Sequence, residues 1–158
     1  MLVTIFTPTY NRGYLLTRLY NSLLEQTDIN FEWIIVDDGS TDSTTVSYTH
    51  QNNSGKHVAV NKGIDLASGD YFGIVDSDDY LLPDAIYSIK TAFNTLELSK
   101  NFAGISFNKG YSENECIGKT FSGEYLDATS IERKKYNILG DKFEVFFTRI
   151  LKENKFPV

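Results

Sequence analysis

The sequence FEWIIVDDGSTD occupies residues 31–42 and joins two different patterns. Phe31–Val36 is a short apolar run rich in β-branched residues, which predicts a buried strand. Asp37-Asp38-Gly39-Ser40 follows at once, and its glycine allows the chain to turn sharply. The same order returns further on, where the apolar run Tyr71–Val75 is closed by Asp76-Ser77-Asp78-Asp79. Acidic side chains at the ends of buried strands are therefore a repeated feature of this chain.

The rest of the chain alternates between extended and helical patterns. Strands are expected at Leu2–Phe6, Phe31–Val36, Val46–His50, Tyr71–Val75 and Phe102–Phe107. Helices are expected at Tyr14–Gln26, Lys56–Ala67, Pro83–Leu98 and Phe147–Asn154. This alternation predicts a Rossmann-like α/β fold, with a mainly parallel sheet and helices on both faces. A length of 158 residues suits a single domain.

Composition narrows the class of protein. The net charge of −6 argues against a nucleic-acid partner, which would call for a basic surface. An anionic ligand remains compatible, because a diphosphate can be held on a divalent cation that takes carboxylate ligands. The single cysteine excludes an internal disulfide and suits the reducing cytoplasm. No stretch approaches the ~20 apolar residues that span a bilayer. We therefore expect a cytoplasmic chain without a transmembrane segment, which reaches a membrane surface only through a longer parent protein.

Three polar clusters come directly after expected strands. They are Thr7-Pro8-Thr9, Asp37-Asp38 and Asp76-Ser77-Asp78. The carboxyl ends of parallel strands meet at one edge of a sheet, and open α/β sheets bind their ligands in the crevice at that edge. The three clusters together therefore predict a binding site there.

The cluster Asp76-Ser77-Asp78-Asp79 is a candidate metal site. Carboxylates this close repel one another, and a bound divalent cation removes that cost. Mg²⁺ and Mn²⁺ prefer oxygen ligands, and Mg²⁺ commonly combines one or two carboxylates with phosphate oxygens. The same residues also suit a simple turn whose aspartates cap the next helix. Asp79 is the one most easily explained as structural.

Two further segments could bind parts of a nucleotide. A carboxylate of the pair Asp37 and Asp38 could accept the imide N–H of uracil, although turn formation explains the pair equally well. Asn53-Ser54-Gly55-Lys56 precedes an expected helix, where backbone amides favour anions and Lys56 could reach a diphosphate. Glycine-containing turns before helices are common, so this second pattern is less specific.

Taken in order, six short segments resemble those of family 2 glycosyltransferases. They are Pro8-Thr9-Tyr10-Asn11-Arg12, Val36-Asp37-Asp38-Gly39-Ser40-Thr41-Asp42, Asn53-Ser54-Gly55-Lys56, Asn61-Lys62-Gly63, Val75-Asp76-Ser77-Asp78-Asp79 and Pro83-Asp84. Each is weak alone, but the ordered set, which covers about the first hundred residues, is specific. The resemblance implies a GT-A fold and inverting transfer of a sugar from a nucleoside-diphosphate sugar, most simply a UDP-sugar, to a hydroxyl of a glycan or lipid-linked acceptor. Surface polysaccharide or glycan synthesis is the implied setting.

The resemblance also implies a role for each matched residue. Pro8, Thr9, Tyr10 and Arg12 would line the nucleotide loop, Asp38 would read the base with Asp37 beside it, and Lys56 would face the diphosphate. In the Asp-X-Asp motif Asp76-Ser77-Asp78, Asp78 would bind the Mn²⁺ or Mg²⁺ ion directly, while Asp76 would contact the ribose or the metal shell.

The resemblance is incomplete in two places. Only Ser43–Thr45 separate Asp42 from the next expected strand, where the family usually has a helix. The family's catalytic base often belongs to an acidic pair that opens a helix, but no adjacent acidic pair follows Asp84. We therefore expect the base beyond Val158 in a longer parent protein, with Asp141 as the local candidate. Residues 1–107 would form the donor-binding core, and residues 108–158 would begin the acceptor side.

Two other functions compete with this interpretation. A metal-dependent nucleotidyltransferase could use the same aspartates, but it should carry a glycine-rich phosphate loop after the first strand, and Pro8-Thr9-Tyr10-Asn11-Arg12 is not one. A non-catalytic or truncated nucleotide-sugar-binding module would bind the donor without transferring it. An assay of transfer beside an assay of binding separates this second alternative from an enzyme.

Overall fold

The computed structural model describes residues 1–42, 49–96, 100–112, 115–119, 121–123 and 125–158. The chain forms two compact units. The first contains Met1–Ile105 and Glu144–Val158, and the second contains Ser106–Phe143. The expected functional division at residue 107 concerns donor and acceptor roles and remains a prediction. In the described part of the chain, no helix is both long and apolar enough to cross a bilayer.

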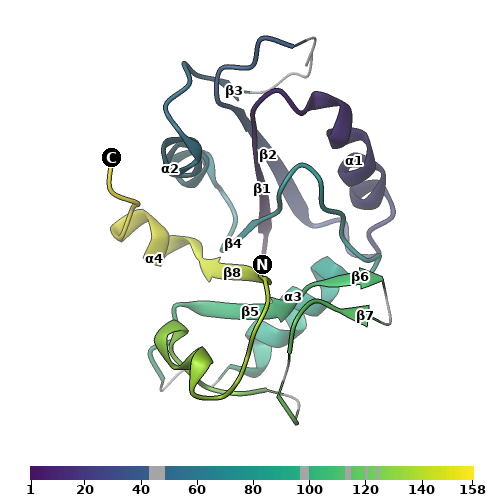
Figure 1. Ribbon diagram of the computed structural model, residues 1–158, viewed down its shortest axis with the longest axis vertical. Coiled ribbons are helices and arrows are strands. Elements are labelled where there is room, and N and C mark those ends of the chain that lie inside the picture. The colour runs from purple at the N-terminus through teal and green to yellow at the C-terminus, as the bar shows by residue number, and fades with distance from the viewer. Residues whose placement is uncertain (43–48, 97–99, 113–114, 120, 124) are drawn as a thin grey trace. The chain divides into compact units, whose positions relative to one another are not determined.

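The chain contains a six-stranded sheet of order β3-β2-β1-β4-β8-β5 (Figure 1). Its residues belong to the first unit, except Ser106–Asn108 and Lys142–Phe143, which belong to the second. Its strands are β1 (Val3–Thr9), β2 (Phe31–Asp37), β3 (Thr49–His50), β4 (Tyr71–Ile74), β5 (Gly104–Asn108) and β8 (Lys142–Phe147). β1 pairs in parallel with β2 and β4, and β2 pairs in parallel with β3. β8 returns late in the sequence and pairs antiparallel with β4. The expectation of a mainly parallel α/β sheet is confirmed.

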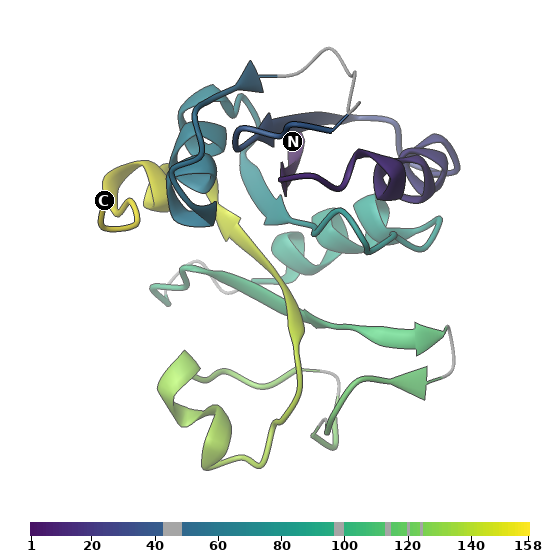
Figure 2. The same ribbon diagram turned by 45° about the horizontal axis from the view of Figure 1, so that its top comes forward.

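Helices cover both faces of this sheet (Figure 2). They are α1 (Leu16–Leu24), which follows a 3₁₀ turn at Gly13–Leu15, then α2 (Lys56–Leu66), α3 (Ala85–Thr95) and α4 (Thr148–Glu153). On one face Trp33 stacks on Tyr20 of α1, and Tyr71 stacks on Phe93 of α3. On the other face, a core cluster joins α2 and α4 to the strands. The side chains alternate between these two helical layers because successive strand residues point to opposite faces.

Phe6 and Phe72 form the centre of the α2 face. Both side chains are fully buried, and their rings stack with centroids 5.3 Å apart. α2 approaches them closely because it carries Gly63, where an added Cβ would lie 2.2 Å from the Phe6 ring. The glycine of the Asn61-Lys62-Gly63 segment is therefore explained by packing.

Several element boundaries differ from expectation: the first helix is Leu16–Leu24 after a 3₁₀ turn, and the strand expected at Phe102–Phe107 is Gly104–Asn108. Two further differences have a clear physical reason. β1 continues through Pro8 to Thr9, although we expected it to end before the proline. The carbonyl of Phe6 bonds toward β4, so Pro8, two residues on, faces the same side, and the pairing with β4 already ends at Phe6. The missing N–H of Pro8 therefore costs no bond between strands. The third helix begins at Ala85 and not at Pro83, whose carbonyl instead accepts a hydrogen bond from Thr27 N.

The expected strand Val46–His50 and the question of a helix after Asp42 fall mainly on residues 43–48, outside the described residues. The described part of that strand, Thr49–His50, is β3. The final helix agrees with expectation to within one residue at each end.

The second unit is built on short elements. β6 (Gly110–Ser112) and β7 (Glu115–Cys116) form an antiparallel pair. A 3₁₀ turn at Ser130–Lys134 begins with a capping box. The Glu132 carboxylate accepts from the backbone N–H and the hydroxyl of Thr129, and the Thr129 side chain accepts from the backbone N–H of Glu132. The hydrogen bonds from the Thr129 backbone and hydroxyl lower the pKa of Glu132. Local capping of this kind stabilises turns that bury little surface.

Candidate functional site

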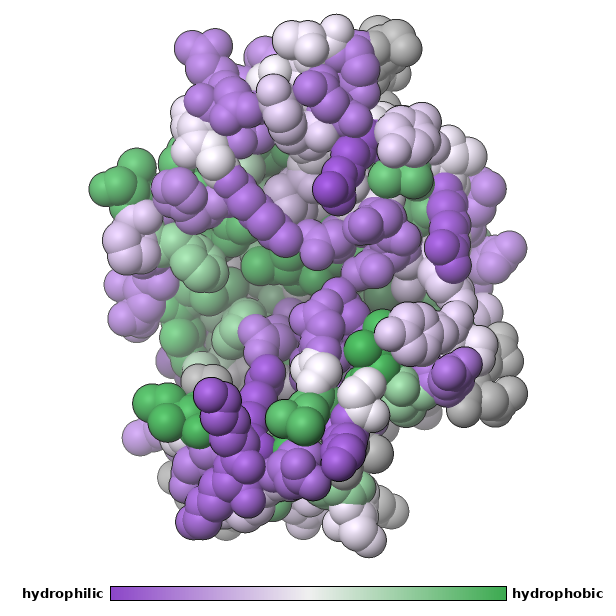
Figure 3. Space-filling model, in the orientation of Figure 1, coloured by the Kyte–Doolittle hydropathy of each residue, from purple (hydrophilic) through white to green (hydrophobic). Residues whose placement is uncertain are grey.

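The polar clusters lie together at the carboxyl edge of the parallel strands. Thr9, the last residue of β1, is paired with Asp37, the last residue of β2. Asp38 N donates to Thr9 O at 2.9 Å, so the register persists one residue past the strands. Val75 N, just before the acidic turn, donates to Phe6 O at 2.9 Å. Hydrophilic residues cover the upper part of Figure 3, where Figure 1 shows the ends of β1 and β2.

The loop after β1 is tied to the loop after β2 through Asn11. Its backbone N–H donates to Ser40 Oγ at 2.8 Å, and its side-chain Oδ1 accepts from Thr41 N at 2.8 Å and from Asp42 N at 3.3 Å. Asn11 itself has φ of 51°, a left-handed conformation that asparagine tolerates better than most residues. Sequence reasoning gave Asn11 no role, although an asparagine before Arg-Gly is a signal for such a turn.

Thr9 and Tyr10, neighbours at the end of β1, differ in their exposure to solvent. Thr9 is buried, and its hydroxyl has no hydrogen-bond partner among the described residues. A buried hydroxyl without a partner is unfavourable unless a ligand satisfies it. Tyr10 is 47% exposed, so its ring is available at the same edge. Pro8 lies within β1, directly before them.

Asp37 is almost fully buried and serves local structure. Its Oδ1 accepts from the backbone and hydroxyl of Ser40, and its Oδ2 lies 2.9 Å from Nδ1 of His50. The histidine ring is more than half exposed, so its other nitrogen faces away from this carboxylate. His50 was given no role from sequence. Its place on β3 opposite Asp37 depends on strand pairing, which no local pattern revealed.

Asp38 holds the loop that leads into α2. Its Oδ1 accepts from Gln51 Nε2 at 2.7 Å and from Ser54 N at 2.8 Å, while Oδ2 accepts from Gly55 N at 2.8 Å. Burial raises the pKa of this carboxyl, but the three hydrogen bonds outweigh burial, and the resulting pKa is below its ordinary value. Asp38 is therefore an ionised clamp on the loop before Lys56.

Gly55 is needed at the end of that loop. Its φ is 94°, a conformation that L-residues rarely adopt, and an added Cβ would lie 2.9 Å from His57 Cε1. α2 starts with the next residue, Lys56. The glycine thus lets the chain turn so that its own N–H reaches Asp38 while Lys56 begins the helix.

Two basic side chains pair with the acidic turn after β4. Lys56 Nζ lies 2.5 Å from Asp76 Oδ1, and Arg12 Nη1 lies 3.7 Å from Asp78 Oδ2. All four side chains are at least a third exposed, so the pairs can exchange partners with solvent or a ligand. Ser77 is buried between the two aspartates, and Asp79 N donates to Asp76 O at 3.0 Å to close the turn. Alternation along the turn thus points Asp76 and Asp78 outward and Ser77 inward.

This donor set is compatible with a divalent cation shared with a phosphate ligand. Among the described residues, no group of three or more His, Cys, Asp or Glu side chains gathers as a complete metal site. Asp76 and Asp78 supply hard oxygen donors, and their negative charges are balanced by Lys56 and Arg12. Mg²⁺ typically takes only one or two protein carboxylates and completes its shell with phosphate and water. Two carboxylates are within the number that such a mixed shell takes from the protein.

The remaining candidate, Asp141, belongs to the second unit. Its Oδ2 lies 2.7 Å from Lys109 Nζ in an ion pair. The carboxylate is mostly exposed, with a side-chain exposure of 69%. Its sequence role as a possible base remains a prediction.

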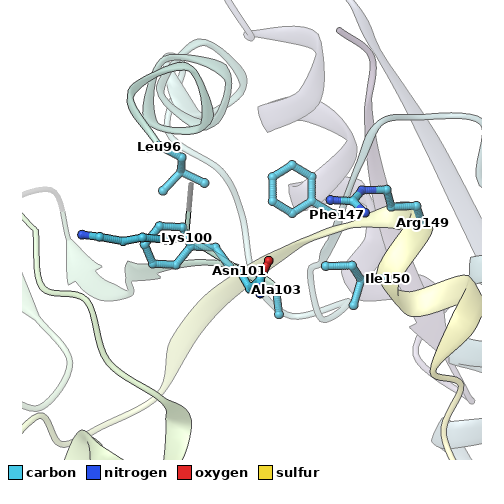
Figure 4. A pocket seen from close by; sticks show the side chains of 8 residues that line it. Leu96, Lys100, Asn101, Ala103, Phe147, Arg149 and Ile150 are labelled. Carbon is cyan, nitrogen blue, oxygen red and sulfur yellow. The ribbon is translucent and has the colours of Figure 1, made fainter. Parts of the chain in front are cut away.

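A separate cavity of about 320 Å³ lies beside the end of α3 and the start of α4 (Figure 4). It is lined by Leu96, Lys100, Asn101, Phe102, Ala103, Phe147, Arg149 and Ile150. None of the residues expected to bind donor or metal contributes to it. The sheet edge, where the predicted residues and the paired charges gather, is therefore the better candidate site.

Comparison with known proteins agrees with this arrangement. A family model described as "Glycosyl transferase family 2" matches residues 4–106. Chondroitin synthase from Escherichia coli is 39% identical over 97 residues, which are 54% of this chain and 14% of that protein. The chain thus spans only a small part of this relative.

Solved structures of two proteins illustrate the shared fold over nearly the whole chain. The crystal structure of S. aureus TarS 1–349 reaches a TM-score of 0.75 at 23% identity, covering 99% of this chain and 50% of that one. TarS 1–349 was also solved with UDP and with UDP-GlcNAc. Mannosyltransferase PcManGT from Pyrobaculum calidifontis, solved with GDP-Man and Mn²⁺, gives a TM-score of 0.68 at 18% identity, covering 98% and 47%.

Proposed function

Because the chain belongs to glycosyltransferase family 2, we propose that its sheet edge binds a nucleoside-diphosphate sugar together with Mn²⁺ or Mg²⁺. The full protein would transfer the sugar to a hydroxyl acceptor. The mainly parallel sheet with helices on both faces is the GT-A fold, as in TarS. The observation that carries the proposal is the meeting of Lys56 and Arg12 with Asp76 and Asp78 at that edge.

The four charges at the edge are arranged for a ligand that brings both a cation and an anion. The two basic residues pair with the two carboxylates. A metal diphosphate offers the carboxylates a cation and offers the basic residues phosphate oxygens, so every charge keeps a partner. Phosphate accepts charge-assisted hydrogen bonds from both lysine and arginine. This exchange supports Asp78 as metal ligand, Asp76 beside it, and Lys56 and Arg12 at the diphosphate.

The nucleoside would occupy the loops after β1 and β2. The unpartnered hydroxyl of buried Thr9 and the exposed ring of Tyr10 support this position. Among the described residues Asp38 accepts three hydrogen bonds, of which one is to Oδ2, and a carboxylate oxygen can accept a second bond, here from a uracil imide N–H. Uridine is proposed because TarS, which has the higher TM-score of the two neighbours, was solved with UDP and UDP-GlcNAc, whereas PcManGT was solved with GDP-Man.

Transfer would proceed with inversion. The acceptor oxygen attacks the anomeric carbon from the face opposite the diphosphate, the bond from that carbon to the diphosphate oxygen breaks, and a general base takes the hydroxyl proton. A bound divalent cation would stabilise the negative charge on the leaving diphosphate. Lys56 and Arg12 would add to that stabilisation. The base is proposed to lie outside this chain, with Asp141 as the local alternative.

Polysaccharide or glycan synthesis is the proposed setting. The relative from Escherichia coli is named a chondroitin synthase, which joins the family to polymer synthesis. A glycan or lipid-linked acceptor and a cytoplasmic donor are proposed on this basis. A non-catalytic donor-binding module would share every feature of the sheet edge and differ only in lacking transfer.

A thermal-shift panel tests the donor part of the proposal. UDP, GDP, ADP and CDP are each added with Mn²⁺ and, separately, with excess chelator. A ligand present at a hundredfold excess over its dissociation constant stabilises the folded state by about 2.7 kcal/mol, so binding is visible as a rise in Tm. We expect UDP with Mn²⁺ to give the largest rise. Equal shifts for all four nucleotides would contradict uridine selectivity, and a parallel transfer assay separates an enzyme from a binding module.

A further inference from the structure

The segment Tyr80–Ile86, between the acidic turn and α3, runs along α1. The Arg18 guanidinium lies 4.1 Å from the centroid of the Tyr80 ring. Leu81 N donates to Ser22 Oγ at 3.1 Å, and Thr27 N donates to Pro83 O at 2.8 Å. The contacts follow one another in order along both segments. α1 and the residues just after it therefore support the chain directly after Asp79.

Gln26 supplies two further contacts with this segment. Its Nε2 donates to Leu82 O at 2.8 Å, and its Oε1 accepts from Ile86 N at 3.1 Å. Nε2 also donates to Ser22 O at 2.9 Å. Both N–H groups and the carbonyl are therefore used, and because a backbone N–H can only donate, Ile86 fixes which end of the amide is oxygen. The side chain is only 6% exposed, so its bonds are not shared with solvent.

Ser22 completes this buried polar cluster. Its hydroxyl accepts from Leu81 N and donates to Leu19 O at 2.8 Å, so it joins α1 to the segment in a fixed direction. Ser22 is as buried as Gln26. Buried polar side chains with every group satisfied specify one arrangement of the backbone around them.

The acidic turn is consequently held at both ends. Before it, Val75 N is bonded to Phe6 O of β1. After it, Leu81 is bonded to Ser22 of α1. The same helix is entered through the turn that starts at Arg12, whose carbonyl accepts from Leu15 N, and the Arg12 side chain meets Asp78. Helix α1 therefore links Arg12, which precedes it, to Ser22, which holds the chain just after Asp78, the partner of Arg12.

We propose that Ser22 and Gln26 are positioning residues for the Asp76–Asp79 turn. They set where the two outward carboxylates stand relative to Arg12, without touching a ligand themselves. The inference deepens the proposed function, because it assigns the alignment of the proposed metal and diphosphate site to a buried cluster behind it. Displacing a site by about 1 Å from a distant position can cost on the order of a hundredfold in activity.

The test compares Ser22→Ala and Gln26→Leu with Thr4→Val. Ser22 and Thr4 are matched, because each is a buried hydroxyl that accepts one loop N–H at 3.1 Å, from Leu81 and Gly69 respectively, and donates to another oxygen. Thr4 lies near the amino end of β1, away from the acidic turn. Two quantities are measured on the 158-residue chain: the ratio of UDP affinities with Mn²⁺ and with chelator, and the amide ¹H–¹⁵N resonances of residues 76–79.

We expect the affinity ratio to fall about tenfold in Gln26→Leu and about threefold in Ser22→Ala, and the turn resonances to shift in both. Thr4→Val should lower Tm but keep the affinity ratio within about twofold of the wild-type value, because substitutions at distant sites act independently. Unchanged resonances in both Ser22→Ala and Gln26→Leu overturn the positioning role, whatever happens to UDP. The same conclusion follows if Thr4→Val lowers the ratio equally. If the wild-type chain itself shows no gain with Mn²⁺, the proposed metal site fails, and the resonances alone decide the positioning role.

Discussion

At the scale of single residues, the two aspartates after β2 show how neighbouring positions acquire different tasks. Asp37 points to Ser40 and His50, whereas Asp38 points to Gln51 and the loop before α2. Sequence reasoning placed both beside the base and could not separate them. Ser40 lies in the same turn as Asp37, but His50 lies on β3 and Gln51 in the loop that follows it. The pairing of β2 with β3 brings these two more distant partners into reach.

Asp38→Asn tests the ionised clamp. The change replaces one acceptor oxygen with an N–H₂ that faces backbone donors, so we expect a loss of about 1–3 kcal/mol in the free energy of unfolding at neutral pH. The pKa of Asp38 is lowered in the folded state. Its stabilising effect is therefore full above the unfolded-state pKa of about 3.9 and is lost as pH falls through the folded-state value.

Urea denaturation of both proteins at a series of pH values checks this prediction. The difference between wild type and Asp38→Asn should be constant from about pH 6 to pH 8 and should shrink below about pH 4. A difference that stays the same in acid would mean that ionisation of Asp38 contributes nothing, and that the asparagine acts only through its shape.

Lys56→Ala tests the exchange of partners at the edge. Because the Lys56–Asp76 pair is exposed, its loss should change stability by less than about 1 kcal/mol. We expect UDP affinity in the presence of Mn²⁺ to fall about tenfold, since one charge-assisted hydrogen bond to phosphate is removed. Mn²⁺ affinity without nucleotide should rise or stay equal, because a competing cation has left Asp76.

Lys62→Ala is the matched control, since it removes the same charge from the same helix. Calorimetric titrations of Mn²⁺ and of UDP distinguish the two variants. If Lys62→Ala weakens UDP binding as much as Lys56→Ala, the effect comes from net charge and not from the position of Lys56.

At the scale of elements, the predicted order of strands and helices is confirmed wherever a strand or helix has its own hydrophobic pattern. β2, α2, β4 and α4 were all located from local sequence. No strand was assigned to residues 142–147, which form β8. Other failures are at the ends of elements, where distant partners decide the boundary. The third helix was placed at Pro83 because proline suits a first helical turn, but Thr27, Gln26 and Ser22 hold residues 81–83 against α1 in another conformation.

The contact between α2 and β1 gives a prediction that helix propensity alone would reverse. Alanine is favoured over glycine inside a helix by about 1 kcal/mol, so Gly63→Ala should stabilise an isolated α2. Here the new Cβ would lie 2.2 Å from the Phe6 ring, and overpacking typically costs about 1–3 kcal/mol. We expect a net loss of stability, measured as a lower midpoint of urea denaturation.

A double-mutant cycle with Phe6→Leu supplies the control. The smaller side chain leaves room for the added methyl, so Gly63→Ala should cost less in that background than in wild type. Equal costs in both backgrounds would show that Phe6 is not the neighbour that requires glycine.

At the scale of the whole molecule, convergence of the polar clusters on one sheet edge was predictable, because parallel strands bring their carboxyl ends together. The return of β8 beside β4 was not, since residues 142–147 carry no local signal of which strand they join. The pairing of Lys56 with Asp76 and of Arg12 with Asp78 also depended on the fold. These four residues were predicted from the sequence as site residues, but which basic residue pairs with which carboxylate is decided by the tertiary structure.

The central claim is that the sheet edge binds a nucleoside diphosphate through a divalent cation held by Asp78. The most direct measurement is calorimetric titration of UDP, with Mn²⁺ and with excess chelator, into the wild type, Asp78→Ala and Asp79→Ala. We expect Mn²⁺ to raise the UDP affinity of the wild type by about tenfold or more, equivalent to at least about 1.4 kcal/mol. Asp78→Ala should abolish that gain, and Asp79→Ala should keep most of it. Equal UDP affinity with Mn²⁺ and with chelator in the wild type, or equal losses in the two variants, would contradict the claim.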